Sequence, residues 1–304
     1  MYHYVRKPDC NFPYFRFLDF NNFKRQLDYF EQKFGFVELK EWEAFINDSI
    51  EPLAKGKVIL TFDDAMRDHF EYVFDELVTR KLWGIFYVPT RPYSDGLMLD
   101  VHRIHLLSGA VKGIDLFDFT SSIISEDMVS DKKRDEFRKK TYLGQSNYTG
   151  VTEVKRLLNY FIDSRCRSET INRLCENFSV SSDPKSFYIS EDNISTMEDN
   201  GMVIGSHTVS HPVMSKLSLT EQCNEVSESF NVLSKICSLK HKTYSHPYGG
   251  FHSFNEDTIS VLKDNNVDYS FNVESRQICL SDFKNGRHRL PRFDCNEFPF
   301  GKAS

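Results

Sequence analysis

The sequence predicts an α/β fold, a parallel sheet or barrel, that is interrupted by a helical insertion. Short apolar segments alternate with amphipathic, helix-like segments over residues 1–94 and again over residues 186–304. Such alternation of strands and helices is typical of parallel α/β architectures. Residues 95–185 break this rhythm, because they are more polar and largely helical in pattern. We therefore predict an α/β domain from residues 1–94 plus 186–304, and a helical insertion over 95–185 that shapes the substrate site.

Apolar spacing assigns the elements of the first half of the α/β domain. The segments 2–5, 36–39, 58–62 and 84–88 are predicted strands. Phenylalanine and leucine recur at helical spacing between Asp19, which can cap a helix, and Gly35, which can end one. A further helix is expected over residues 68–80.

The second half of the α/β domain shows the same alternation. Predicted strands cover residues 187–189, 202–206, 243–245, 269–273 and 289–293. Predicted helices cover residues 193–200, 218–239 and 255–265. The longest of them opens on Ser218-Leu219-Thr220-Glu221, which has the pattern of a capping box.

Two adjacent carboxylates, Asp63 and Asp64, follow the apolar segment 58–62. Where a strand passes into a loop, both side chains can reach one pocket. Two neighbouring carboxylates are costly to hold together unless a cation or a shared proton relieves their repulsion. A solvated acidic turn is the alternative for such a pair taken alone. A second polar cluster further along the chain makes the binding-site interpretation the stronger one.

That second cluster places His207 and His211 directly after another short apolar segment, residues 202–206. A spacing of four residues lets two imidazoles bind one metal ion. Hydrolytic zinc sites use about three protein ligands and leave one position open. One aspartate and two histidines satisfy this need, and one aspartate remains as a base.

These motifs carry a family resemblance. Thr61-Phe62-Asp63-Asp64 and His207-Thr208-Val209-Ser210-His211-Pro212 resemble the first two motifs of the polysaccharide deacetylase superfamily (NodB homology, carbohydrate esterase family 4). Tyr244-Ser245-His246-Pro247-Tyr248-Gly249 resembles its third motif, Met1-Tyr2-His3-Tyr4-Val5 an opening strand, and Leu290-Pro291-Arg292-Phe293 a closing strand. The resemblance covers residues 1–94 and 186–304. It implies a distorted (β/α)-barrel of about seven strands, with the site at the carboxyl ends of the strands.

The resemblance also implies roles for individual residues. Asp63 corresponds to the general base, and Asp64, His207 and His211 correspond to the ligands of one divalent metal ion. Zinc is the first expectation, with cobalt, nickel and iron(II) as alternatives, because this ligand set suits all of them. The backbone N–H of Tyr248 corresponds to the donor that stabilises the oxyanion of the intermediate.

The chain departs from the family pattern at two places. Ser245 stands where the third motif of well-known members has an arginine that orients the base, so Arg292 is a candidate substitute, with a purely structural salt bridge as the alternative. The histidine motif that supplies the family's acid is not recognisable. His246, and after it His288, are the candidates to protonate the leaving group. If neither serves, the leaving group is an alkoxide, which needs less help from an acid.

Composition excludes several functional classes. The net charge is −6 with both signs mixed, which argues against a nucleic-acid partner. No apolar segment approaches the length of about 20 residues that spans a membrane, and no signal-peptide core is recognisable. Seven scattered cysteines suit reduced thiols. We therefore expect a cytoplasmic protein without stable membrane insertion; its oligomeric state stays open.

The expected substrate is an acetylated sugar. A cytoplasmic enzyme with a large insertion favours a small nucleotide- or lipid-linked N-acetyl sugar from the synthesis of a surface polysaccharide, such as lipopolysaccharide or capsule. Sugar O-deacetylation or deformylation is the second enzymatic interpretation. A catalytically dead module that binds metal and sugar is the alternative of another class. In the insertion, His102 and His105 either line a substrate pocket or serve packing and hydrogen bonding.

Overall fold

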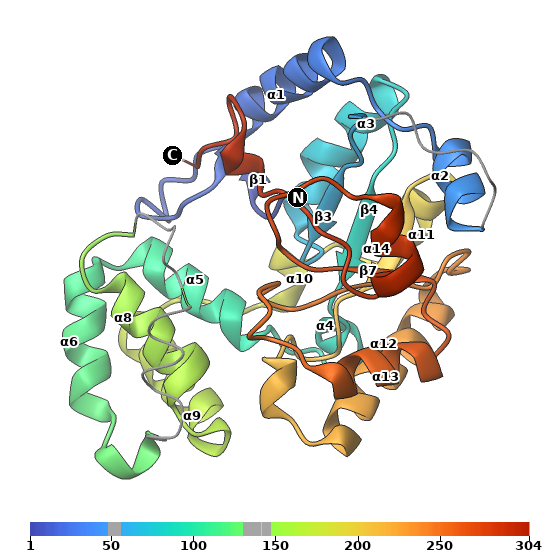
Figure 1. The fold of residues 1–304 in the computed structure, drawn as a ribbon. Helices are drawn as coiled ribbons and strands as arrows, with labels where there is room; N and C mark the ends of the chain where they lie inside the picture. The colour runs from blue at the N-terminus through green and yellow to red at the C-terminus, as the bar shows by residue number, and fades with distance from the viewer. Residues whose placement is uncertain (48–55, 130–140, 142–146, 304) are drawn as a thin grey trace. The chain divides into compact units, whose positions relative to one another are not determined.

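The computed structural model describes residues 1–47, 56–129, 141 and 147–303 (Figure 1). The chain divides into two compact units. The first consists of Met1–Lys7, Phe17–Gly96 and Lys185–Ser304, and the second of Pro8–Arg16 and Leu97–Pro184. Each unit is described in turn. In the part of the chain that the structure describes, no helix combines the length and the apolar character needed to cross a membrane.

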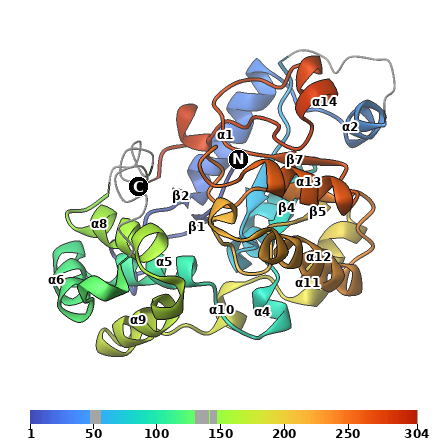
Figure 2. The same ribbon diagram turned by 60° about the horizontal axis from the view of Figure 1, so that its bottom comes forward.

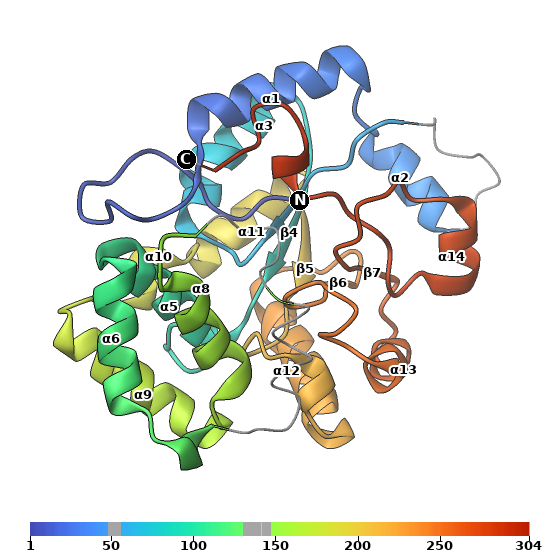
Figure 3. The ribbon, with the colours of Figure 1, turned by 60° about the vertical axis from the view of Figure 1, so that its left-hand side comes forward.

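The first unit is built on a five-stranded parallel sheet. The strands lie in the order β3 (Thr61–Asp63), β4 (Ile85–Val88), β5 (Val203–Ser206), β6 (Thr243–Ser245) and β7 (Tyr269–Phe271), and β5 to β7 can be followed in Figure 3. Each strand is short and fully buried. The predicted α/β class with a parallel sheet is therefore confirmed.

Single bridges continue this sheet at both edges. Tyr2 pairs with Phe62 beside β3, and Leu290 pairs with Phe271 beside β7, both in parallel. The N–H of Cys295, beyond Leu290, donates to the carbonyl of Met1 at 3.1 Å, which joins the two edges. The sheet therefore curls into the distorted barrel that the resemblance implied. Tyr2 belongs to the predicted strand 2–5 and Leu290 to the predicted strand 289–293, so both segments take part in the sheet through these bridges.

The helices of the first unit alternate with its strands along the chain. Their bounds are α1 (Phe20–Lys33), α2 (Leu39–Ile46), α3 (Asp75–Thr79), α4 (Arg91–Ser94), α10 (Pro184–Phe187), α11 (Glu191–Asp199), α12 (Leu219–Ile236), α13 (Glu256–Asp264) and α14 (Leu280–Gly286). A π-helical turn, η1 (His69–Phe74), precedes α3, and a small parallel pair consists of β1 (Val5–Arg6) and β2 (Leu18–Asp19). Helices α11, α12 and α13 pack side by side (Figure 2). The capping box predicted at Ser218 is present, with Glu221 as its partner.

Two predicted strands are wrong. Residues 36–39 make only one bridge, between Phe36 and Val58, because Glu38 caps helix α2 and the helix begins at Leu39. Residues 187–189 do not form a parallel strand, because Pro184 opens the short helix α10 and Tyr188 then bridges Met66 in an antiparallel manner. Proline is well suited to the first turn of a helix, and this local signal outweighed the apolar pattern.

The alternation of side chains along the strands builds one core on each face of the sheet. On the outer face, the rings of Tyr2, Phe62 and Phe86 stack with centroids 5.2 and 4.6 Å apart. On the inner face, Trp42 packs against the rings of Tyr269 and Phe271. Because neighbouring residues of a strand face opposite sides, the outward direction of Phe62 turns the next residue, Asp63, toward the inner face.

The second unit is helical among its described residues. It contains α5 (Asp100–Ala110), α6 (Gly113–Ile123), α8 (Val151–Arg156) and α9 (Ser164–Asn177), together with the short turns η2 (Glu126–Met128) and η3 (Leu157–Phe161). Its own apolar core joins α5, α6, α8 and α9. Residues 130–140 and 142–146 of the predicted insertion lie outside the described residues. His102 is fully buried on α5 with the ring of His105 6.2 Å away, which favours the packing interpretation of this pair.

Candidate metal centre

The polar residues predicted from the sequence converge at the carboxyl ends of the parallel strands. Asp63 is the last residue of β3 and Asp64 follows it, His207 follows β5, and Ser245 ends β6. All of these side chains are buried. In α/β barrels this end of the strands carries the reactive groups, because the loops that leave it can vary without disturbing the sheet.

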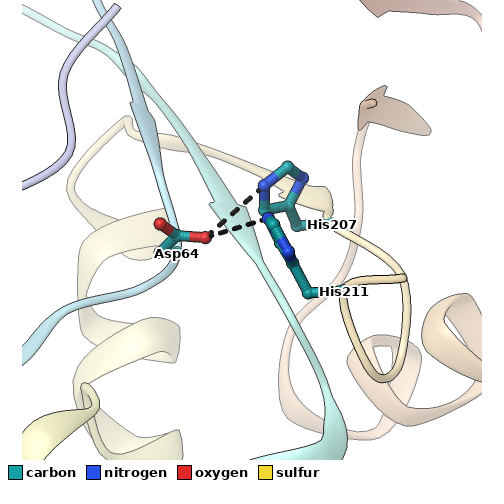
Figure 4. Close-up of side chains that lie close together, drawn as sticks. All are labelled: Asp64, His207 and His211. Carbon is teal, nitrogen blue, oxygen red and sulfur yellow. Dashed lines mark ion pairs between the residues drawn. The ribbon is translucent and has the colours of Figure 1, made fainter. Parts of the chain in front are cut away.

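Asp64, His207 and His211 form a compact cluster (Figure 4). The Oδ1 atom of Asp64 lies 3.5 Å from Nε2 of His207 and 3.6 Å from Nε2 of His211. The three ligand atoms all lie within 4.8 Å of one another. Ligands about 2.0–2.1 Å from a tetrahedral zinc ion stand roughly 3.3–3.4 Å apart. The two distances from Asp64 are close to this spacing, so the cluster suits three ligands of one divalent cation.

A hydrogen bond at Nδ1, the ring nitrogen that does not face Asp64, fixes the orientation of His207. Its Nδ1–H donates to the carbonyl of Ser245 at 2.7 Å, so its Nε2 lone pair faces Asp64. Burial lowers the pKa of His207 and favours the neutral imidazole, which is the form that binds metals. A backbone carbonyl behind a ligand histidine is a common means of setting its tautomer and ring direction.

The backbone at this site adopts an unusual conformation. Asp64, Thr208, His211 and Tyr248 have φ values of 83°, 66°, 55° and 62°. Residues other than glycine rarely occupy this left-handed region, and each instance costs roughly 1–3 kcal/mol. Positive φ at these four positions turns the chain abruptly in the three loops that follow β3, β5 and β6. The surrounding contacts must therefore hold these loops in place.

Asp63 is paired with Arg292 beside the cluster. The guanidinium donates from Nη1 to Oδ1 and from Nη2 to Oδ2, both at 2.8 Å, and both side chains are buried. Burial alone would raise the pKa of Asp63, but the charge and hydrogen bonds of Arg292 outweigh it and hold this pKa well below its usual range. Asp63 is therefore ionised. The expected contact between Arg292 and Asp63 is present.

Ser245 completes this pair. Its hydroxyl donates to Oδ2 of Asp63 at 3.2 Å and accepts from Nη2 of Arg292 at 2.8 Å. Arg292 also donates to the hydroxyl of Thr61 at 3.2 Å. Ser245 stands where the family pattern has an arginine, and the guanidinium of Arg292 contacts the Asp63 carboxylate from the closing segment of the barrel.

The structure does not bring His246 to this carboxylate. Ser245 faces Asp63, so the next residue along the strand faces away, and the His246 ring stacks on Phe254 with centroids 4.0 Å apart. Its Nε2–H donates to the carbonyl of His288 at 2.8 Å, and burial lowers the pKa of His246 to about 3. These contacts give His246 a packing role. Burial also lowers the pKa of His288, to about 4.

Tyr248 lies next to the cluster. The centroid of its ring is 4.8 Å from that of His211, and its carbonyl accepts from the N–H of Gly250 at 2.9 Å. The turn therefore carries the backbone of Tyr248 to the same end of the barrel as the candidate ligands.

The sequence analysis missed His3. Tyr2 pairs with Phe62 and its ring faces the outer core, so the following residue, His3, lies beside Asp63 and faces the inner side. His3 is partly exposed, and it is close enough to Asp63 to contribute to the lowering of the pKa of Asp63. The sequence signal is a lone histidine in the first predicted strand, and a sequence alone does not show which strand will lie beside it.

Part of the chain matches a sequence-family model, and its fold is similar to solved structures. A sequence model described as polysaccharide deacetylase matches residues 160–270. Among solved structures, a Streptococcus pyogenes deacetylase in complex with acetate has a TM-score of 0.55 at 15% identity, covering 96% of this chain and 88% of that one. A de-N-acetylase from Aggregatibacter actinomycetemcomitans has a TM-score of 0.51 at 14% identity, covering 96% and 92%.

A polysaccharide deacetylase from Bacillus cereus has a TM-score of 0.52 at 13% identity, covering 96% of this chain and 62% of that one. At these identities the structures show a shared fold. A search of curated proteins gives no significant sequence match. The family model confirms the resemblance to the polysaccharide deacetylases over the part of the chain that holds the second and third motifs.

Proposed function

We propose that the chain is a metal-dependent deacetylase that removes the acetyl group from an N-acetylated sugar. The observation that carries the proposal is the buried Asp64, His207 and His211 cluster next to Asp63, a carboxylate held ionised. A metal-binding module without activity would need the three ligands but would have no use for a fourth buried residue, the Asp63 carboxylate, beside them.

The donor set suits a single zinc ion, with cobalt, nickel or iron(II) as alternatives. Asp64 would bind through a carboxylate oxygen, and both histidines through Nε2. A divalent cation held there would polarise the acetyl carbonyl and acidify the attacking water. The metal's identity in the cell would follow availability as much as affinity.

Asp63 would accept the proton of the attacking water. Two hydrogen bonds from Arg292 and one from the Ser245 hydroxyl use three of the about four acceptor positions of an ionised carboxylate, so one remains for water. The pairing also lowers the basicity of Asp63, which suits a base that acts on an acidified water. Arg292 is thus a positioning residue, which fixes the direction of the base.

Two further groups complete the proposed chemistry. The backbone N–H of Tyr248 would donate to the oxyanion of the tetrahedral intermediate. His3, which follows the Tyr2–Phe62 bridge and lies beside Asp63, would protonate the leaving amine. An amide substrate needs such a donor more than an ester does, because an amine leaves poorly without a proton. Sugar O-deacetylation and deformylation remain the second enzymatic candidates.

We propose a small nucleotide- or lipid-linked sugar of surface polysaccharide synthesis as the substrate, in the cytoplasm. All seven cysteines are free thiols, which supports a reducing compartment. The fold is shared with deacetylases that include a polysaccharide deacetylase, so a polymer is the competing substrate.

Acetate release tests this proposal. The protein, reconstituted with zinc or cobalt, is incubated with free, nucleotide-linked and lipid-linked N-acetyl and O-acetyl sugars, and with an acetylated polymer. We expect release from a small linked N-acetyl sugar, and loss of release after chelation. Release from the polymer alone would overturn the substrate proposal. Absence of release from every compound by metal-loaded protein would favour the binding module.

A further inference from the structure

The segment from His207 to His211 carries two of the three candidate ligands and holds little regular structure. Thr208 and His211 both have positive φ, of 66° and 55°. Within the segment, the N–H of His211 donates to the Thr208 hydroxyl at 2.9 Å, and the N–H of Thr208 donates to the Ser206 hydroxyl at 3.2 Å. These local bonds set the turn, but they do not fix its position relative to Asp64, which directly follows β3.

One carboxylate on helix α12 binds the middle of this segment. Oε2 of Glu225 accepts the N–H groups of Val209 and Ser210, both at 2.9 Å, and Oε1 accepts the Ser210 hydroxyl at 2.5 Å. Both oxygens are thus used, and two consecutive backbone donors end on one atom. Hydrogen bonds to a charged acceptor are about twice as strong as those between neutral groups.

Helix α12 is a firm support for this contact. One helical turn after Glu225, the Ser229 hydroxyl lies 2.6 Å from the hydroxyl of Ser206, the last residue of β5. Residues four apart share one face of a helix, so a single face of α12 binds both the strand end and the loop. The opposite side of the loop is held by the N–H of Arg91, which donates to the carbonyl of Val209 at 2.9 Å.

We infer that Glu225 is a positioning residue for the metal centre, which places the two histidines so that their Nε2 atoms converge on Asp64. The inference deepens the proposed function and depends on it, because it concerns the same site. Glu225 does not touch the candidate ligand atoms. It acts through the backbone between them, in the way that outer groups around metal centres commonly set the direction of the ligands.

The chain offers a matched control for this role. Glu198, on α11, also accepts two consecutive backbone N–H groups, from Ser238 at 2.7 Å and Leu239 at 3.0 Å. Leu239 likewise has a positive φ, of 50°, and Glu198 is half-buried, as is Glu225. The two glutamates therefore stabilise loops in the same manner, but the loop that Glu198 holds carries no candidate ligand.

The test compares zinc affinity, by competition with a chromophoric chelator, among full-length Glu225→Asp, Glu225→Gln and Glu198→Asp variants. Glu225→Asp keeps the charge but is too short to reach the loop, so we expect zinc affinity to fall about tenfold or more. Glu225→Gln keeps the length: its amide oxygen can accept the backbone donors and its amide nitrogen can donate to Ser210. We expect its zinc affinity, and the absorption spectrum of its cobalt(II) form, to stay near those of the parent.

Three outcomes would overturn the inference: unchanged zinc affinity in Glu225→Asp, an equal loss in Glu198→Asp, or Glu225→Gln falling below Glu225→Asp. The last would mean that the charge of Glu225 acts, and not its hydrogen bonds. Failure of the proposed function is distinguishable, because it shows in the parent protein itself, either as no binding of divalent metal at this site or as no acetate release by the metal-loaded protein. Thermal unfolding of the metal-free proteins measures how far each variant loses stability apart from metal binding.

Discussion

Asp63→Asn is expected to lower the rate of acetate release by about 10²–10⁴-fold, the range that a positioned general base contributes. Asparagine has nearly the same shape as aspartate but cannot accept the proton of the attacking water. The ligands Asp64, His207 and His211 remain, so zinc content and zinc affinity should stay near those of the parent. The measurement is acetate release at saturating substrate together with metal analysis of the same protein sample.

The pairing of these two readouts separates the candidate functions. Loss of turnover with retained metal identifies Asp63 as a base, whereas loss of both would make it a part of the metal site. Unchanged turnover would remove Asp63 from the mechanism. The variant also leaves Arg292 without its charge partner, so its stability needs to be measured before its rate is interpreted.

Arg292→Met is expected to lower the free energy of unfolding by about 3–5 kcal/mol, the cost of breaking a buried ion pair on one side. Methionine fills similar space but leaves the Asp63 carboxylate, which is 3% exposed, without its main partner. Urea unfolding measures this loss. Activity should fall too, because only the Ser245 hydroxyl, of the two side chains described as holding Asp63, then remains to direct the proposed base.

The double variant with Asp63→Asn provides the control for this prediction. Once residue 63 is neutral, Arg292→Met should cost clearly less than it does alone, with a coupling of about 0.5–3 kcal/mol. Low pH should also reduce the cost of Arg292→Met in free energy of unfolding. With the arginine removed, burial raises the pKa of Asp63, and protonation at acidic pH then relieves the unpaired charge. A cost that is the same in both backgrounds would mean that Arg292 stabilises the fold by packing alone.

The sequence predicted the parts of the fold that have strong local signals. The alternation of strands and helices gave the parallel sheet, and β6 was placed at residues 243–245 as observed. The capping residues Asp19 and Ser218 marked the starts of α1 and α12 correctly. Errors fell on short edge segments, where a cap at Glu38 or a proline at 184 decided the structure against the apolar pattern.

The candidate site likewise has residues that the sequence predicted and residues that it did not. Asp63 and Asp64 lie at the end of β3, and His207 and His211 lie in the loop after β5; parallel strands bring such positions together, so the sequence was enough to pair them. His3 and Glu225 were missed, for a shared physical reason. Strand pairing places His3 beside Asp63, and helix packing brings Glu225 to the loop between the two histidines. Neither residue belongs to a motif of its own. His246 was chosen for its nearness in sequence, but the side-chain alternation of the strand turns it away.

The central claim is that Asp64, His207 and His211 bind a divalent cation beside Asp63. Anomalous X-ray scattering from crystals of the zinc-loaded protein tests it most directly, since it locates zinc without knowledge of the substrate. The account predicts a single strong peak about 2.0–2.2 Å from the Asp64 carboxylate and from Nε2 of both histidines. Zinc bound elsewhere, or no zinc at this cluster in well-ordered crystals, would contradict it.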